Sequence, residues 1–246
     1  MHKQKMVKII INLALALILL AVIPAVSAGA EDDFVIENGI LIKYNGTEKE
    51  VAIPNNVTSI ERSAFTDCIS LESLMIPDSV TSIKNWLFNG CKNLKEINVS
   101  ENNHDYSSID GVLFNKDKTK LIRYLGTKPE TSYNIPNGVI SITEGAFSFC
   151  KNLTNVTLPD SLEEIAGFAF LDCTSLTSII IPDSVTSIEW KAFDDCASLT
   201  SIVITNSITS IGYAAFSGCE NLTIHGVSGS YAEEYTKENE IKFQEF

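Results

Sequence analysis

The six cysteines of this 246-residue chain are its most regularly placed reactive side chains. Neighbouring cysteines are 23 residues apart, except for one interval of 59: Cys68, Cys91, Cys150, Cys173, Cys196 and Cys219. A fixed spacing indicates stacked coils, in which equivalent residues project in parallel about 4.8 Å apart, too far at Cβ for a disulfide. Zinc ligands lie two to four residues apart, and this column lacks histidine. We therefore expect buried, reduced thiols that pack as small apolar side chains.

Histidines and paired carboxylates offer little acid–base or nucleophilic chemistry. Beyond residue 30 the histidines are His104 and His225, and neither lies in a recognisable nucleophile, base or metal motif. The run Gly226-Val227-Ser228-Gly229 departs from the G-x-S-x-G turn of hydrolases. The pairs Asp194-Asp195 and Glu163-Glu164 occupy variable positions, where solvated charge is the ordinary role. We expect no catalytic site, and that the chain is not an enzyme.

Asn115, Asp117 and Thr119 come nearest to a metal-binding motif. They alternate like the first ligands of a calcium loop, but the glycine and terminal glutamate of such a loop are missing. We therefore predict no metal site and no cofactor.

The elements that would position any binding residue come from an internal repeat. One run, Ile181-Pro182-Asp183-Ser184-Val185-Thr186-Ser187-Ile188, recurs with small changes from Ile53, Ile76, Ile135 and Leu158, and in altered form from Ile204. An Ala-Phe dipeptide follows in the coils, with Leu87-Phe88 as the variant. Apolar residues separated by Thr and Ser predict an inward-facing set in each coil, completed by stacking on neighbouring coils.

The full pattern is I-P-x-x-V-x-S-I-x-x-x-A-F-x-x-C-x-x-L-x-x-I, and it covers about Ile53 to Leu222. It resembles the bacterial surface-antigen class of leucine-rich repeats, often called BspA-like. The resemblance implies a β-rich α/β solenoid, a right-handed coil of 23-residue repeats. Each coil would place one strand on the concave side, at Ser178 to Ile181 and its equivalents, and a second short strand on the convex side. The resemblance also implies adhesion or extracellular protein binding, without one defined ligand.

Both ends of the repeat carry signals for caps. Two apolar runs between Phe34 and Tyr44 are joined by Asn38-Gly39, which predicts an N-terminal β-hairpin. Near the other end, Ser230 with Glu233 forms a capping box, helical spacing extends to Asn239, and Ile241 and Phe243 then alternate like a strand. We predict a helix–strand cap over residues 227–246.

A 36-residue insert accounts for the long interval between cysteines. Within it, Asp110-Gly111 separates two apolar runs and Leu121 to Tyr124 follows, which predicts strands and hairpin turns. We expect one oversized coil over residues 99–134, bulging outward, with regular coils at about 53–98 and 135–226. No linker interrupts the pattern, so residues 31–246 are predicted to form a single leucine-rich-repeat domain.

The first 30 residues have the composition of a secretory signal peptide. Lys3, Lys5 and Lys8 precede an apolar run from Ile9 to Val22, and Pro24 and small residues follow. The run is shorter than the ~20 residues of a spanning helix. We predict that residues 1–30 are removed and that the protein is secreted, with any association with the cell surface being non-covalent.

The charge balance limits the class of partner. The formal net charge is −13, and loss of three lysines with no acidic residue from residues 1–30 makes it −16. Such a surface repels phosphate backbones and anionic lipids, so nucleic acid and membrane are not expected partners. We expect a monomer that binds an extracellular protein, such as a host or surface protein.

Outward-facing strand positions carry this binding hypothesis, because inward and turn positions are constrained by the fold. The predicted partner-binding residues are Glu50, Ser73, Met75, Glu96, Asn98, Asn155, Thr157, Ser178, Ile180, Ser201 and Val203. Met75, Ile180 and Val203 are the most informative, since an exposed apolar side chain gains nothing unless something covers it.

Two other functions remain open. Four aromatic residues in the variable stretch before Ala-Phe would form a convex strip for stacking sugars: Trp86, Phe168, Trp190 and Tyr213. The alternative for these residues is partly buried packing at the coil edge. A hydrolase would need a deep pocket with converging ionisable groups, which a regular solenoid lacks.

Overall fold

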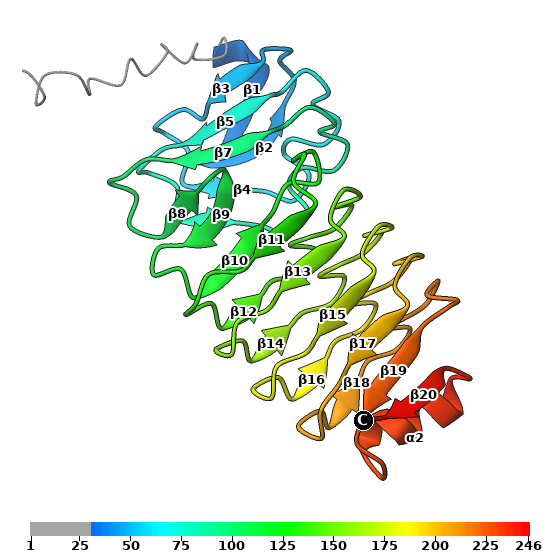
Figure 1. The fold of residues 1–246 in the computed structure, drawn as a ribbon. Coiled ribbons are helices and arrows are strands. Elements are labelled where there is room, and N and C mark those ends of the chain that lie inside the picture. The colour runs from blue at the N-terminus through cyan, green and yellow to red at the C-terminus, as the bar shows by residue number, and fades with distance from the viewer. Residues whose placement is uncertain (1–30) are drawn as a thin grey trace, which may run out of the picture.

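The chain winds into an elongated solenoid of about nine turns, with the N-terminal hairpin at one end and an α-helix at the other (Figure 1). The computed structural model describes residues 31–246, and the signal peptide predicted for residues 1–30 lies outside this range. The β-rich solenoid with 23-residue coils is confirmed.

One strand of three or four residues recurs in each coil. These long strands form two parallel sheets, one of three strands and one of six. The first contains β3 (Glu50–Ala52), β5 (Ser73–Ile76) and β7 (Glu96–Val99). The second contains β11 (Ser132–Asn134), β13 (Asn155–Thr157), β15 (Ser178–Ile180), β17 (Ser201–Val203), β19 (Thr223–Gly226) and β20 (Lys242–Glu245). We call the coils of these sheets the first stack and the second stack. The resemblance implied one concave strand in each coil, and the structure confirms it.

Two-residue strands follow the next turn of each coil, on the other side of the solenoid (Figure 1). They are β4 (Ser59–Ile60), β6 (Ser82–Ile83), β12 (Ser141–Ile142), β14 (Glu164–Ile165), β16 (Ser187–Ile188) and β18 (Ser210–Ile211). Their pairing is parallel and joins residues 23 apart, as in Ser187↔Ser210. The turn before β16 closes with a hydrogen bond from Val185 N to Pro182 O, and the turns before β4, β6, β12 and β14 close in the same way.

The interior is a column of apolar side chains that repeats from coil to coil. Ile179, Val185 and Ile188 are at most 2% exposed. The phenylalanine rings stack face to face, with 5.0 Å between centroids for both Phe147–Phe170 and Phe170–Phe193. Offset aromatic stacking adds to the large apolar area that each ring buries, so this column contributes strongly to the cohesion of the stack.

Both predicted caps are present. Strands β1 (Phe34–Glu37) and β2 (Ile40–Tyr44) form an antiparallel hairpin. A 3₁₀ turn (Glu31–Asp33) precedes it. Asn38 and Gly39 have φ of 50° and 78°, as a two-residue hairpin turn of type I′ requires. At the other end, helix α2 (Tyr231–Glu238) begins with the Ser230 side chain accepting from Glu233 N, and β20 then pairs with β19.

The insert does not bulge outward, so that part of the sequence prediction was wrong. Strands β8 (Tyr106–Ile109), β9 (Val112–Asn115) and β10 (Lys120–Arg123) pair antiparallel, and β10 continues in parallel into β12. Val112, Leu113 and Phe114 are at most 1% exposed. Leu113 packs into the core of the first stack, whereas Val112 and Phe114 pack into the core of the second. Three consecutive apolar residues make β9 a strand buried on both faces, which separates two cores.

The end of the insert repeats the N-terminal cap. The segment Leu41-Ile42-Lys43-Tyr44-Asn45-Gly46-Thr47 corresponds to Leu121-Ile122-Arg123-Tyr124-Leu125-Gly126-Thr127. Both segments follow an antiparallel strand and pair in parallel with the next short strand, through Leu41↔Ile60 and Leu121↔Ile142. Each tyrosine N–H donates to the carbonyl of the next Ala-Phe dipeptide, at 2.8 Å for Tyr44 and 2.9 Å for Tyr124. We call this unit the start module. Its second copy begins a new stack inside the chain.

Candidate binding surface

The predicted binding residues lie on the outer side of the long strands. Along β15, Ile179 is buried, whereas Ser178 and Ile180 on either side of it are exposed. The same alternation occurs in β13, and in β3 the buried Val51 lies between the exposed Glu50 and the half-buried Ala52. Six predicted residues are exposed and five are half-buried; the half-buried ones are Ser73, Met75, Asn98, Ser201 and Val203. The structure does not bring all eleven together, because Glu50, Ser73, Met75, Glu96 and Asn98 lie on the first stack and the others on the second.

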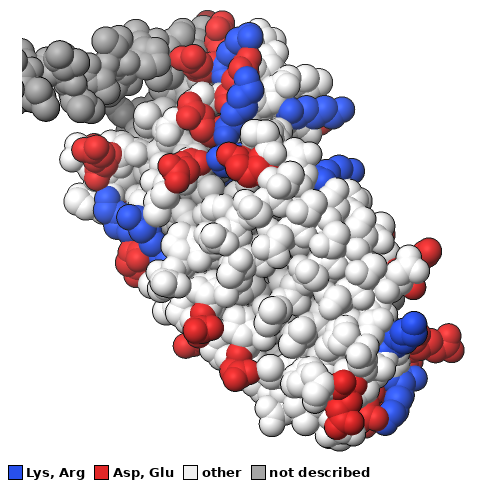
Figure 2. Space-filling view, in the orientation of Figure 1, with Lys and Arg blue, Asp and Glu red and all other residues white. Residues whose placement is uncertain are grey.

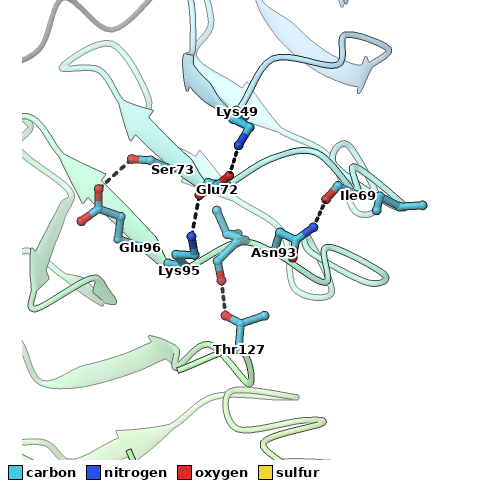
Figure 3. A network of polar contacts seen from close by, with 9 residues as sticks. Lys49, Ile69, Glu72, Ser73, Asn93, Lys95, Glu96 and Thr127 are labelled. Atoms are coloured by element: carbon cyan, nitrogen blue, oxygen red, sulfur yellow. Dashed lines mark hydrogen bonds and ion pairs between the residues drawn. The ribbon is translucent and has the colours of Figure 1, made fainter. Parts of the chain in front are cut away.

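The outer side of the first stack is charged. Glu72 accepts from two lysines of the neighbouring coils, with 2.7 Å between Oε1 and Lys49 Nζ and 2.5 Å between Oε2 and Lys95 Nζ (Figure 3). These hydrogen bonds lower the pKa of Glu72 to about 2. Beside them, Ser73 Oγ donates to Glu96 Oε1 at 3.0 Å. Paired positive and negative side chains therefore cover the outer side of β3, β5 and β7.

In the second stack, threonines occupy the positions that correspond to Lys49, Glu72 and Lys95 of the first stack. Thr177 Oγ1 donates to Thr154 O at 3.1 Å, Thr154 Oγ1 to Thr131 O at 3.0 Å, and Thr200 Oγ1 to Thr177 O at 3.4 Å. Because the hydroxyl groups bond to the backbone of the previous coil, their methyl groups are left as the outer surface of this column.

The outer side of the second stack has a broad area without charged side chains. Figure 2 shows it over the second stack, with charges gathered over the first stack and along the edges. We call the outward residues of β13 to β19 the neutral face: Asn155, Thr157, Ser178, Ile180, Ser201, Val203, Thr223 and His225. Ile180 is its most prominent apolar member, since 67% of this residue is exposed.

Thr223 and His225 were missed as members of this face. They pair with Ser201 and Val203, and they flank the buried Ile224. The last coil is one residue shorter, so counting 23 residues from Ser201 reaches Ile224 instead. The missing residue lies after Leu222, because the inward-facing Ile224 comes two residues after Leu222, whereas Ile202 comes three residues after Leu199. The apolar Ile224 between Thr223 and His225 is the signal that would have given the correct register.

The four aromatic residues of the alternative site form a line on the other side of the coils. Trp86 and Phe168 pack edge to face with centroids 5.4 Å apart, as do Phe168 and Trp190 at 4.2 Å. Trp86 Nε1 also donates to Glu144 Oε1 at 2.7 Å. This packing half-buries Trp86 and Phe168, while 47% of Trp190 and 84% of Tyr213 remain exposed. Sugar stacking at these residues stays a prediction.

The cysteines form a buried column, as expected. All six are free thiols, and each sulfur donates to the carbonyl of the aromatic residue one coil earlier, as in Cys173 Sγ to Phe147 O at 3.1 Å. The first members of the two stacks, Cys68 and Cys150, donate to Tyr44 O and Tyr124 O, both at 3.8 Å. Burial raises the pKa of Cys150 well above its usual range. These thiols therefore act in packing.

Several of the other candidate side chains have structural partners. Asn115 and Asp117 close the turn between β9 and β10, where Asp117 Oδ1 accepts from Thr119 Oγ1 at 2.8 Å. Asp194 pairs with Lys191 at 2.9 Å. Residues 31–246 contain no group of three His, Cys, Asp or Glu side chains placed to hold a metal ion.

Two clefts form where regular stacking ends. The sequence-based expectation was that a regular solenoid has no deep pocket. A cleft of about 720 Å³ lies between the last coil and α2, and another of about 570 Å³ lies at the junction of the two stacks. The first is lined by Tyr213, Tyr235 and Glu238 among others.

The repeat geometry agrees with a family model. The model for the BspA type leucine rich repeat region matches residues 44–128 and 124–233, with six copies. The chain belongs to the BspA-type leucine-rich-repeat family. Within the described residues of this BspA-type protein, no helix is long and apolar enough to cross a membrane.

Solved structures of bacterial proteins share the fold. A leucine-rich repeat protein from Eubacterium ventriosum is 28% identical with a TM-score of 0.60, and the match covers 75% of this chain and 60% of that one. A leucine rich cell surface protein from Faecalibacterium prausnitzii is 34% identical, also with a TM-score of 0.60, over 75% of this chain and 55% of that one. The BspA-type chain thus spans 55–60% of the length of these two proteins.

The pneumococcal vaccine antigen PcpA shows the fold alone. It is 23% identical with a TM-score of 0.58, over 80% of this chain and 67% of that one. No curated protein matches the BspA-type chain.

Proposed function

We propose that this BspA-type protein is an extracellular protein-binding module that uses the neutral face for adhesion. The observation that carries the proposal is the absence of Lys, Arg, Asp and Glu from the outward positions of β13 to β19, in a chain with a formal net charge of −13. A depletion of charge around exposed apolar side chains is the composition of a protein interface core.

The physical character of the face suits a broad protein surface. Its side chains are short and stand on paired strands, so little side-chain entropy is lost when a partner covers them. Ile180 and the half-buried Val203 lie on adjacent strands and give the face an apolar centre. The hydroxyl and amide groups around this centre supply hydrogen bonds at the rim.

An extracellular location is part of the proposal. It rests on the predicted signal peptide and on the description of the Faecalibacterium prausnitzii relative as a cell surface protein. We also propose a monomeric binding module without catalytic activity, since the neutral face brings no carboxylate or lysine together for acid–base chemistry.

A paired substitution tests the face. In Ile180→Lys with Val203→Lys, charge enters the apolar centre of the face without touching the core. We expect the thermal midpoint to stay within a few degrees, as for other surface changes. Binding of the labelled protein to members of an extracellular-protein array should weaken tenfold or more.

The matched control is Trp190→Ser with Tyr213→Ser, which changes two exposed residues on the opposite side. Their exposure favours carbohydrate binding as the second candidate function. If the control pair abolishes binding to a glycan array while Ile180→Lys with Val203→Lys leaves all binding unchanged, the aromatic strip replaces the neutral face.

A further inference from the structure

The cleft at the junction of the two stacks has a composition opposite to that of the whole chain. It has a volume of about 570 Å³, within the range of small-molecule sites. Arg123, Lys92 and Lys151 line it, and none of its lining residues is Asp or Glu. The chain as a whole has 18 basic and 31 acidic residues. Lys151 pairs with Asp172, at 2.8 Å between Nζ and Oδ2, so Arg123 and Lys92 supply the excess positive charge of this cleft.

Arg123 is a half-buried cation of the cleft. Its NH1 donates to Gly145 O at 2.5 Å and to Ser148 Oγ at 2.6 Å. Its Nε is buried and has no hydrogen-bond partner within residues 31–246. The carbonyl and hydroxyl partners do not neutralise the guanidinium, and no carboxylate of the described chain pairs with it. Burial lowers the pKa of Arg123, although arginine stays charged in proteins. A carboxylate supplied from outside would give this group its missing counter-charge.

Phe149 breaks the repeat at this cleft. It precedes Cys150 and has a φ of 63°, in the left-handed region that disfavours bulky side chains. The equivalent positions before the other cysteines have φ between 55° and 76° and are all Asp or Gly: Asp67, Gly90, Asp172, Asp195 and Gly218. The Phe149 side chain lines the cleft, and the residue is 41% exposed. Phe149 is therefore disfavoured by the conformation of the turn and is not buried in the core. This combination indicates a role in binding.

The remaining walls favour hydrocarbon over a peptide. Phe88 and Leu125 are apolar members of the lining. The nearby hydroxyl groups already donate to backbone carbonyls, Thr127 Oγ1 to Leu94 O and Ser148 Oγ to Gly145 O. A peptide backbone would bring amide groups that these walls leave without partners, whereas an alkyl chain needs none.

From the cleft, its unpaired arginine and the exposed Phe149, we infer that the junction of the two stacks binds a medium-chain aliphatic carboxylate. The carboxylate lies toward Arg123 and Lys92, and the alkyl chain lies against Phe149, Phe88 and Leu125. This site is independent of the neutral face.

Calorimetric titration of the full protein with sodium octanoate tests the inference, with 1-octanol and N-acetylleucine as comparison ligands. We expect octanoate to bind at least tenfold more tightly than either. Equal binding of octanol would show that the basic residues take no part, and tighter binding of N-acetylleucine would assign the cleft to a polypeptide carboxyl terminus. Either result, or no binding of octanoate, overturns the inference.

Two variants locate the site. Phe149→Gly introduces the residue found at the equivalent Gly90 and Gly218, so the thermal midpoint should stay the same or rise while octanoate affinity falls at least tenfold. Lys92→Glu should weaken octanoate several-fold. Its matched control is Lys43→Glu, because Lys43 is the exposed counterpart of Arg123 in the first start module and lies outside the cleft. Unchanged affinity in Phe149→Gly, with a lower midpoint, would make Phe149 a packing residue and contradict the assignment.

Discussion

The residue directly before each long strand differs in kind between the two stacks. It is Lys49, Glu72 and Lys95 in the first stack, and Thr131, Thr154, Thr177 and Thr200 before β11, β13, β15 and β17 of the second. In the first stack these side chains form ion pairs with one another. In the second stack their hydroxyl groups donate hydrogen bonds to backbone carbonyls. The backbone pairing is the same in both, so the fold tolerates either solution.

This difference shows that the two stacks share a backbone but not a surface. Inward positions are fixed by the core, whereas the position before the strand is free to set the chemistry of the outer face. The charged column limits the first stack to partners that complement its pattern of lysines and glutamates. The threonine column leaves the neutral face open to a broad apolar or polar partner.

The largest expected effect concerns the aromatic columns of the two cores. Phe193 stacks on Phe170 at 5.0 Å and on Phe216 at 5.5 Å, whereas Phe65 meets tilted rings at 5.8 and 5.9 Å. Phe→Ala in a core lowers the free energy of unfolding by about 3–5 kcal/mol. We expect Phe193→Ala to lie nearer the upper value and Phe65→Ala nearer the lower, as measured by urea denaturation. A larger loss for Phe65→Ala would contradict this order.

The next effect concerns the coupling between the stacks. Leu113 comes from the hairpin that starts the second stack but packs into the core of the first. Leu113→Ala should cost about 2–5 kcal/mol. It should also separate two signals that coincide in the wild type: Trp86 fluorescence in a Trp190→Phe background and Trp190 fluorescence in a Trp86→Phe background.

Trp86 follows β6 of the first stack and packs on Phe168 of the second, so its fluorescence should change when the first stack detaches, at lower urea than the signal of Trp190. Phe114→Ala is the matched control, because Phe114 packs into the second core. If Leu113→Ala moves both tryptophan signals together, β9 does not couple two separable cores.

The smallest effect concerns the ion pairs of the first stack. The pKa of Glu72 is lowered to about 2 by its hydrogen bonds with Lys49 and Lys95. The pairs therefore stabilise the folded state above the ordinary glutamate pKa of about 4.5. That stabilisation is lost as the pH falls from there toward about 2. We expect Glu72→Gln to lower the thermal midpoint slightly at pH 7 and to match the wild type near pH 2. Glu50→Gln serves as control, because Glu50 takes part in none of the ion pairs of residues 31–246, and it should lower the midpoint at pH 7 less than Glu72→Gln does.

The repeat and the hairpin were predictable because local patterns determine them. Ile179 faces inward and Ile180 outward because side chains alternate along a strand, and Asn38-Gly39 selects a tight turn. The outward orientation of the predicted residues on the long strands follows from the same alternation. The division of the outer surface into a charged first stack and a neutral second stack was not predicted, because it depends on which residues 23 apart bond to each other.

The arrangement of the insert and the junction cleft was not predicted. Cores on both sides of β9 bury Val112, Leu113 and Phe114. No local sequence pattern predicts that a second core is present. Two signals were nevertheless present in the sequence. One is the repetition of Leu41 to Thr47 at Leu121 to Thr127, and the other is Phe149 at a position otherwise held by Asp or Gly.

The internal start module has a consequence for how such chains change in length. Because it supplies its own hairpin and its own first aromatic ring, the coils after it do not depend on the number of coils before it. Either stack can therefore gain or lose whole 23-residue units while the junction stays intact. Each added unit lengthens one outer face by about 4.8 Å, so the charged and neutral areas can be resized independently within one continuous polypeptide.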